Sequence, residues 1–128
     1  MGGATMRVLV DTDVLIDILR QNARGCSAAT QLIHAETRAC SVITVAEIRA
    51  GMRPAEEQIV RSLLGDMDIL DISPPVAWLA GALQQGHRSF VVGLPDCLIA
   101  ATASVHGLTL FTHNRRHYPF ESMRFATA

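Results

Sequence analysis

Three acidic residues stand at points where the chain passes from a strand or loop into a helix. Asp11 follows a short apolar run, Glu47 lies in the first turn of a predicted helix, and Asp96 opens a strongly apolar helix. In an open sheet of parallel strands, every helix that runs back begins at the same edge, which is where ligands bind. We therefore expect the three carboxylates to converge on one cleft.

Clustered carboxylates repel one another unless a cation holds them together. Oxygen ligands without cysteine or histidine favour Mg²⁺, with Mn²⁺ as a substitute. Such a cation activates water and neutralises charge on a phosphoryl group during transfer. The pattern thus predicts a metal site at Asp11, Glu47 and Asp96, and hydrolysis of a phosphodiester or phosphate.

Each acid also has a purely local explanation. Asp11 and Asp13 suit an Asx-turn or a helix N-cap. The segment TVAE at 44–47 fits a capping box, and Asp96 beside a proline suits a helix N-terminus. Asp17, inside the first helix, is expected to be solvated. These alternatives stay open for each acid taken singly, whereas their joint occurrence at separate junctions favours a site.

Short hydrophobic runs alternate with amphipathic segments along the whole chain. The run 8–10 is continuously apolar, as in a strand buried on both faces, and 14–19 repeats apolar residues at helical spacing. This alternation predicts an α/β fold with a central parallel sheet of four to five strands, covered by helices on both faces. The expected strands are 8–10, 38–43, 67–72, 108–111 and a marginal fifth near 123–125. The expected helices are 14–19, a second one after a break at 22–25, 44–50, 55–64, 74–85 and 94–107.

Composition limits the class of protein. The 128 residues, 49% of them hydrophobic, fit one domain over 1–128, with 1–5 expected to be a disordered leader. No apolar run reaches the roughly 18 residues of a membrane span, and the start has no signal-peptide core, so we expect a cytoplasmic protein without membrane contact. Three distant cysteines argue against a disulfide framework or a zinc site. The net charge of −1 gives no overall basic field, and all eleven basic residues are arginines.

Four segments of the chain match the motifs of a known family: VLVDTDVLIDIL (8–19), SVITVAEIRAG (41–51), LPDCLIAATA (94–103) and LTLFTHNRRHYP (108–119). They occur in that family's order and cover essentially the whole chain, which thus resembles a PIN-domain ribonuclease of the VapC toxin type. The resemblance implies a three-layer α/β/α PIN-like fold and RNA cleavage that depends on Mg²⁺ or Mn²⁺. By matching position, Asp11, Glu47 and Asp96 would hold the metal, and Thr12 would be an auxiliary group that contacts the substrate.

One position departs from the family's pattern. The family often has a fourth acid after the last of these strands, and this chain has Asn114 there. An asparagine offers a carbonyl oxygen but no charge, so a catalytic role for Asn114 implies a weakly held second metal. A turn residue in a loop is the equally open alternative. His113 and His117 are expected to line the same cleft.

The resemblance also implies partners. Toxins of this type cleave RNA, form homodimers and are held inactive by a small VapB-type antitoxin that inserts a segment into the acidic groove. Arg88, Arg115 and Arg116 flank the segments that would border the cleft and are candidate contacts to the RNA backbone. Each of these arginines taken alone is equally consistent with a solvated surface residue.

Other functions fit parts of the pattern. A haloacid-dehalogenase-type phosphatase would use Asp11 and Asp13 as nucleophile and acid, but it would leave Glu47 and Asp96 without a role. A response-regulator receiver needs a lysine late in the chain, and there is none. A stand-alone RNA-processing PIN nuclease and an inactive binding module, in which the acids serve only as caps, stay open. Metal-dependent turnover separates the last of these from an enzyme.

Overall fold

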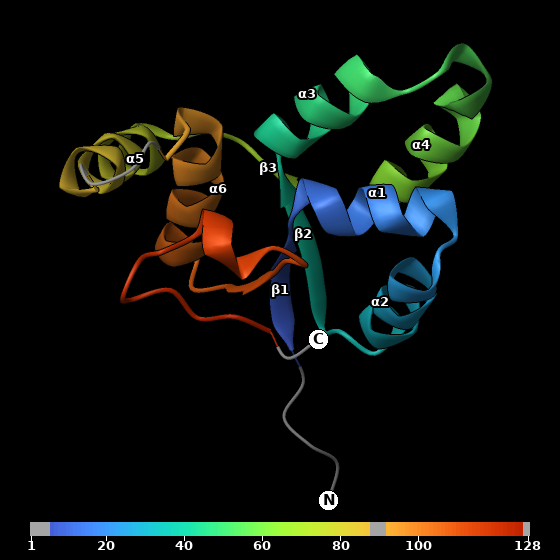
Figure 1. Ribbon diagram of the computed structural model, residues 1–128, viewed down its shortest axis with the longest axis horizontal. Coiled ribbons are helices and arrows are strands. Elements are labelled where there is room, and N and C mark those ends of the chain that lie inside the picture. The colour runs from blue at the N-terminus through green and yellow to red at the C-terminus, as the bar shows by residue number, and fades with distance from the viewer. Residues whose placement is uncertain (1–5, 88–91, 127–128) are drawn as a thin grey trace, which may run out of the picture.

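Four parallel strands form the centre of the molecule in the computed structural model, which describes residues 6–87 and 92–126 (Figure 1). The strand order is β3-β2-β1-β4, so the first strand lies inside the sheet. The strands are short and parallel throughout. Their bounds are β1 Arg7–Val10, β2 Thr37–Ser41, β3 Asp68–Leu70 and β4 Thr109–Phe111. The expected leader at 1–5 lies outside the described residues.

Helices cover both faces of this sheet. Figure 1 shows α1 to α4 on one side of the strands and α5 and α6 on the other. This confirms the predicted three-layer α/β/α arrangement. The helices are α1 Thr12–Arg20, α2 Ala23–Ile33, α3 Val42–Gly51, α4 Glu57–Gly65, α5 Pro74–Gly86 and α6 Leu94–Val105, with short 3-10 turns η1 Pro54–Glu56 and η2 Arg115–His117. In the part of the chain that is described, no helix is both long and apolar enough to cross a membrane.

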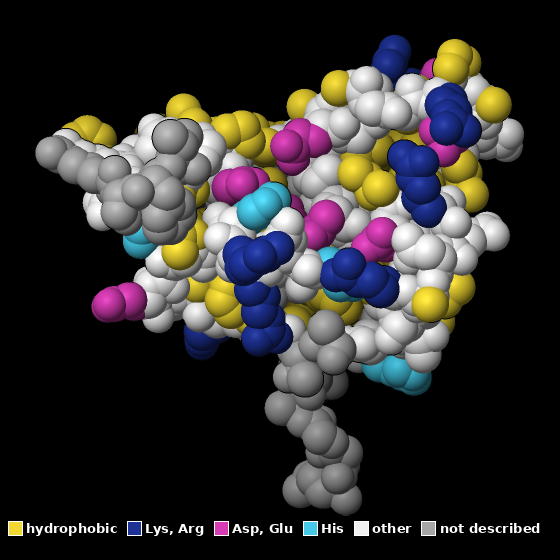
Figure 2. Space-filling model, viewed as in Figure 1, with side chains coloured by type: hydrophobic (Ala, Val, Ile, Leu, Met, Phe, Trp, Pro, Cys, Tyr) yellow, Lys and Arg dark blue, Asp and Glu magenta, His cyan; other side chains and the backbone are white. Residues whose placement is uncertain are grey.

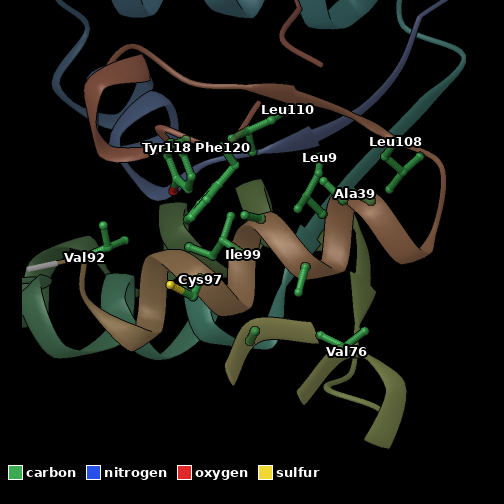
Figure 3. Packing of buried hydrophobic residues seen from close by; sticks show 14 residues of the cluster. Leu9, Ala39, Val76, Val92, Cys97, Ile99, Leu108, Leu110, Tyr118 and Phe120 are labelled. Atoms are coloured by element: carbon green, nitrogen blue, oxygen red, sulfur yellow. The ribbon is translucent and has the colours of Figure 1, made fainter. Parts of the chain in front are cut away.

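Alternation along the strands divides the core in two. Val8 and Val10 pack with the α1–α4 layer, whereas Leu9 between them packs with α5 and α6. In β4, Leu110 and Phe111 divide in the same way. Side chains of successive strand residues point to opposite faces, so a strand in a covered sheet must be apolar at every position. The continuous apolar run in the sequence is the direct consequence. Figure 3 shows Leu9 and Leu110 in the core on the α5–α6 side.

Several elements differ in extent from those expected, and three of these differences follow from specific contacts. Strand β2 ends at Ser41 because that side chain caps α3, accepting a hydrogen bond from the Ile43 N–H at 3.0 Å. Helix α2 begins at Ala23, inside the expected break, because Asn22 caps it through the Gly25 N–H at 2.8 Å. The marginal fifth strand is a single bridge between Leu110 and Phe125, so the sheet has four strands.

The packing of α1 on α2 gives a test of the fold through Gly25. A Cβ built on Gly25 would lie 2.0 Å from the backbone oxygen of Asp17, so the two helices must separate to admit any side chain. We expect Gly25→Ala to lower the free energy of unfolding by about 1–3 kcal/mol or more, as overpacking does. Urea denaturation measures this.

Gly81, which is exposed inside α5, is the matched control. A Cβ there has nothing within 4 Å, so Gly81→Ala should instead stabilise the protein by roughly 0.5–1 kcal/mol through helix propensity. Equal effects of the two substitutions would contradict the close α1–α2 contact.

Candidate functional site

Asp11 lies at the carboxyl end of β1, beside the end of the neighbouring edge strand β4. The residue is only 5% exposed. One oxygen accepts a hydrogen bond from the Thr12 N–H at 2.8 Å, as expected of a cap, and the other accepts from the Thr112 hydroxyl at 2.8 Å. Thr112 directly follows β4. Asp11 therefore does cap α1, but its second bond joins positions far apart in the chain and fixes the carboxylate at the sheet edge.

Asp13 lies two positions further, in the first turn of α1, and is not the cap. Its two oxygens lie 3.4 and 3.5 Å from the Thr112 hydroxyl, and one lies 3.5 Å from the His113 N–H. Burial raises the pKa of Asp13, and the negative charge of Asp11 raises it further. Asp13 thus belongs to the acidic cluster, whereas its sequence position also suited a helix cap.

Glu47 reaches the same edge from α3. The capping box expected at 44–47 is wrong, since α3 begins at Val42 and Glu47 lies in its second turn. The Glu47 Oε1 atom instead accepts a hydrogen bond from the Thr12 hydroxyl at 2.7 Å, and that hydroxyl lies 3.0 Å from the one of Thr44. Thr12 therefore orients Glu47, whose side chain is otherwise exposed.

Asp96 comes from the first turn of α6 and completes the group. Burial raises its pKa most, followed by the negative charge of Asp11 and, more weakly, that of Glu47. His117 opposes this shift from 3.8 Å. Figure 2 shows acidic side chains gathered on one face of the molecule, over the beginnings of α1, α3 and α6. The three acids singled out from the sequence therefore act on one another electrostatically, as their positions predicted.

The donor set fits a hard divalent cation. Among the described residues, no arginine forms an ion pair with Asp11, Asp13, Glu47 or Asp96. The same residues contain no three acidic, histidine or cysteine side chains already close enough to coordinate one ion together. Mg²⁺ suits this arrangement, because it retains several waters and needs only one or two carboxylates directly.

The loop after β4 carries the remaining predicted site residues. The Asn114 side-chain amide lies 3.0 Å from the His117 Nε2 atom, so it is linked to Asp96 through His117. Arg115 donates to the Ala126 carbonyl at 3.0 Å and stacks on Phe125, 5.0 Å from the ring centroid. Arg116 is exposed. Arg88 lies outside the described residues.

Sequence reasoning missed a polar network that supports this loop. Asp17 is not solvated: it binds the His113 Nδ1 atom at 2.6 Å and accepts from the Asn22 amide at 2.8 Å. The Asn22 bond contributes most to the lowered pKa of Asp17. Arg24 donates to the His113 carbonyl at 2.8 Å. The spacing of Asp13 and Asp17, four residues apart on one helix face, was the available signal. Arg24 and His113 border a hollow of about 350 Å³ that Ala23, Ser27, Ala28 and Gln31 also line.

The repulsion among the acids predicts that Asp96→Asn stabilises the fold without metal. Because the folded-state pKa of Asp96 is raised, wild-type stability falls as pH rises above the ordinary aspartate pKa of 3.8. In EDTA at pH 7 the variant should therefore be more stable, by about 1 kcal/mol or less because water screens this partly exposed group. Below pH 3.8 the gain should disappear. Urea denaturation across pH measures it, with the exposed Asp71→Asn as control. A pH-independent gain would contradict the repulsion.

Comparison with known proteins agrees with the fold and the motif positions. The PIN domain family model matches residues 8–125. "Ribonuclease VapC10" from Mycobacterium tuberculosis is 38% identical over 124 residues, which cover 91% of this chain and 90% of the relative. "Ribonuclease VapC19" from the same organism is 32% identical over 114 residues, covering 87% and 91%.

Solved structures share the same arrangement of elements. A toxin–antitoxin complex from Klebsiella pneumoniae contains a chain 33% identical, with a TM-score of 0.75, over 90% of this chain and 92% of that one. VapBC2 from Rickettsia felis, bound to a promoter DNA fragment, shares the fold at 22% identity, with a TM-score of 0.78 over 94% and 98%. The chain therefore belongs to the PIN-domain family, within its VapC group.

Proposed function

We propose that this protein is a divalent-cation-dependent endoribonuclease that acts as the toxin of a VapBC-type pair. The observation that carries the proposal is the gathering of Asp11, Glu47 and Asp96 at one sheet edge without an arginine of the described chain to neutralise them. Relatives named ribonucleases and a similar chain in a toxin–antitoxin complex support it.

In this proposal, Asp11, Glu47 and Asp96 would hold Mg²⁺ or Mn²⁺. The bound ion would activate water and offset negative charge on the phosphodiester. Asp11 is already fixed by two hydrogen bonds and needs no reordering. The Thr12 hydroxyl donates to the Glu47 Oε1 atom, which would orient this carboxylate and leave its other oxygen available to the ion or to its bound water. Thr12 would then contribute to catalysis by orienting Glu47. Asn114 stays a proposed catalytic residue that acts beside His117.

Arginines around the acids would bind the RNA backbone. An acidic cluster repels RNA, so affinity must come from flanking cations. Figure 2 shows basic side chains beside the acids on the same face. Arg24 is the strongest candidate, because its bond to the His113 carbonyl holds the guanidinium at the rim of the hollow beside the site. Arg88, Arg115 and Arg116 stay proposed phosphate contacts, and Arg115 would use the donors that its bond to Ala126 leaves free.

A phosphatase of the haloacid-dehalogenase type is disfavoured by the family to which the chain belongs. The stand-alone RNA-processing nuclease shares the proposed chemistry and differs only in lacking an antitoxin. The inactive binding module differs in lacking turnover. Two experiments therefore separate the three remaining possibilities: one on cleavage and one on complex formation.

Cleavage of a labelled panel of structured RNAs, tRNA included, tests the chemistry. We expect discrete cuts with Mg²⁺ or Mn²⁺, none with EDTA, and restoration on adding the metal back. Asp96→Asn should lower the rate by at least about 100-fold, because it removes a charge that holds the cation. No metal-dependent cleavage by folded wild type would leave the binding module as the better reading.

The same assay separates RNA binding from chemistry. Arg24→Gln should raise KM severalfold with little change in kcat, and its effect should shrink as salt rises, since it removes a phosphate contact. Arg61→Gln is the matched control, because Arg61 is an exposed arginine on α4 that pairs with Glu57. Equal effects of the two substitutions would remove Arg24 from the proposed interface.

We propose that the antitoxin binds in an apolar groove beside the acids. The groove lies between α1 and the α3–η1 segment and has a volume of about 80 Å³. Ile16, Leu19, Ile48 and Met52 supply its apolar surface, and Glu47 borders it, so a segment seated there would reach the acidic cluster. Homodimer formation stays a prediction from the family resemblance, and a cytoplasmic location stays a prediction from the sequence.

Co-expression with the adjacent reading frame tests this partner. We expect a small protein to copurify with the wild type and to inhibit cleavage. Ile16→Glu, which places a charge in the groove, should release the partner while RNA cleavage persists. Val105→Glu, at another exposed apolar position at the end of α6, should retain it. A cleaving enzyme that copurifies with nothing would favour the stand-alone nuclease.

A further inference from the structure

Tyr118 carries a buried hydroxyl that the fold leaves without a hydrogen bond. The residue follows η2 and is only 2% exposed, with its ring packed among the apolar side chains on α6 (Figure 3). Its hydroxyl has no hydrogen-bond partner among the described residues. A buried hydroxyl without a partner destabilises a protein, and phenylalanine would fill the same apolar space without that cost. The presence of tyrosine rather than phenylalanine at this position therefore indicates that the hydroxyl has a function.

The surroundings of this hydroxyl are the acidic cluster. Burial raises the pKa of Tyr118 most, and the negative charges of Asp11, Asp96 and Asp13 add to the shift. The phenol thus stays protonated at neutral pH and can only donate its proton to these acids. The hydroxyl is close enough to Asp11 and Asp96 to interact with both, yet it completes a bond of ordinary length and angle with neither.

The two carboxylates differ in how firmly they are held. Each oxygen of Asp11 already accepts a bond, from the Thr12 N–H and the Thr112 hydroxyl. Asp96 has no such donors within the described chain, and the His117 Nδ1 atom lies 3.8 Å from its carboxylate. Asp96 is therefore the carboxylate that no hydrogen bond within the described chain orients, and Tyr118 is the buried donor near it.

We propose that Tyr118 is a positioning residue whose hydroxyl donates to the Asp96 carboxylate and keeps it turned toward Asp11, in the arrangement that holds a divalent cation. This inference rests on the cation site of the proposed function. It adds a residue outside the acidic set, acting on the ligand rather than on the ion. Partners that orient a metal ligand commonly matter for affinity about 10- to 100-fold.

Isothermal titration with Mn²⁺ measures this effect without RNA. Tyr118→Phe should fold normally and bind Mn²⁺ about 10-fold more weakly than wild type, since it loses only the hydroxyl. His117→Ala is the discriminating variant, because His117 is the other neighbour of Asp96. Weaker binding by His117→Ala together with unchanged binding by Tyr118→Phe would overturn the proposal.

A second measurement follows the hydroxyl itself. Tyr118 is the one tyrosine of the chain, so ¹³Cζ-tyrosine labelling gives a single NMR signal. The chemical shift of that signal should change when Mg²⁺ is added to the wild type, and this change should be absent in Asp96→Asn. A signal unchanged at saturating Mg²⁺ would overturn the proposal even if Tyr118→Phe failed to fold.

These outcomes separate the inference from the nuclease. Wild type that binds Mn²⁺ but cleaves no RNA would end the nuclease proposal and leave the Tyr118 comparison standing. Wild type that cleaves RNA, with Tyr118→Phe equal to it in Mn²⁺ affinity, would end only the role of Tyr118. Wild type that binds no cation would overturn both.

Discussion

A single hydroxyl, that of Thr112, determines where the first acid lies. Thr112 donates to Asp11 at 2.8 Å and accepts from the Asn114 N–H at 3.0 Å, so it joins the ends of β1 and β4 and also shapes the loop that follows. The pairing of Val10 with Phe111 places the residues that follow them, Asp11 and Thr112, side by side. A buried carboxylate needs such donors, because desolvating it without them costs far more than the roughly 2–7 kcal/mol that an unpaired amide or hydroxyl costs. The register of β1 against β4 therefore also fixes the position of the site.

Helix α1 links this edge to the rest of the site through three polar side chains. Thr12 reaches toward Glu47 on α3, while Asp13 and Asp17 face the loop after β4. The loop is therefore tied to α1 in addition to being held by its own η2 turn. Burial and repulsion, which together raise the pKa of Asp13 and of Asp96, persist because two apolar cores, one on each face of the sheet, keep these elements in place.

The convergence of the acids could be predicted because it follows from topology. Apolar runs identify buried parallel strands, and parallel strands bring helix starts to one edge, so three distant positions could be placed together. The start of α3 could not be placed in this way. Ser41 and Thr44 are both good caps three residues apart, and local preference does not choose between them. Tertiary packing does choose: Thr44 is fully buried, with its hydroxyl beside that of Thr12. The bond between Asp17 and His113 was unpredictable for a similar reason, since it joins a helix to a distant loop.

Arginine explains how the loop can be both fixed and available to an anion. Arg24 on α2 holds the loop by donating to the His113 carbonyl, and Arg115 holds the C-terminal segment by donating to the Ala126 carbonyl. A guanidinium has five N–H donors in a planar fork, so one can serve the backbone while others face solvent. A lysine ammonium on a flexible stem would not hold both partners in one geometry. The same side chains can therefore build the rim of the cleft and attract the phosphates that the acids alone would repel.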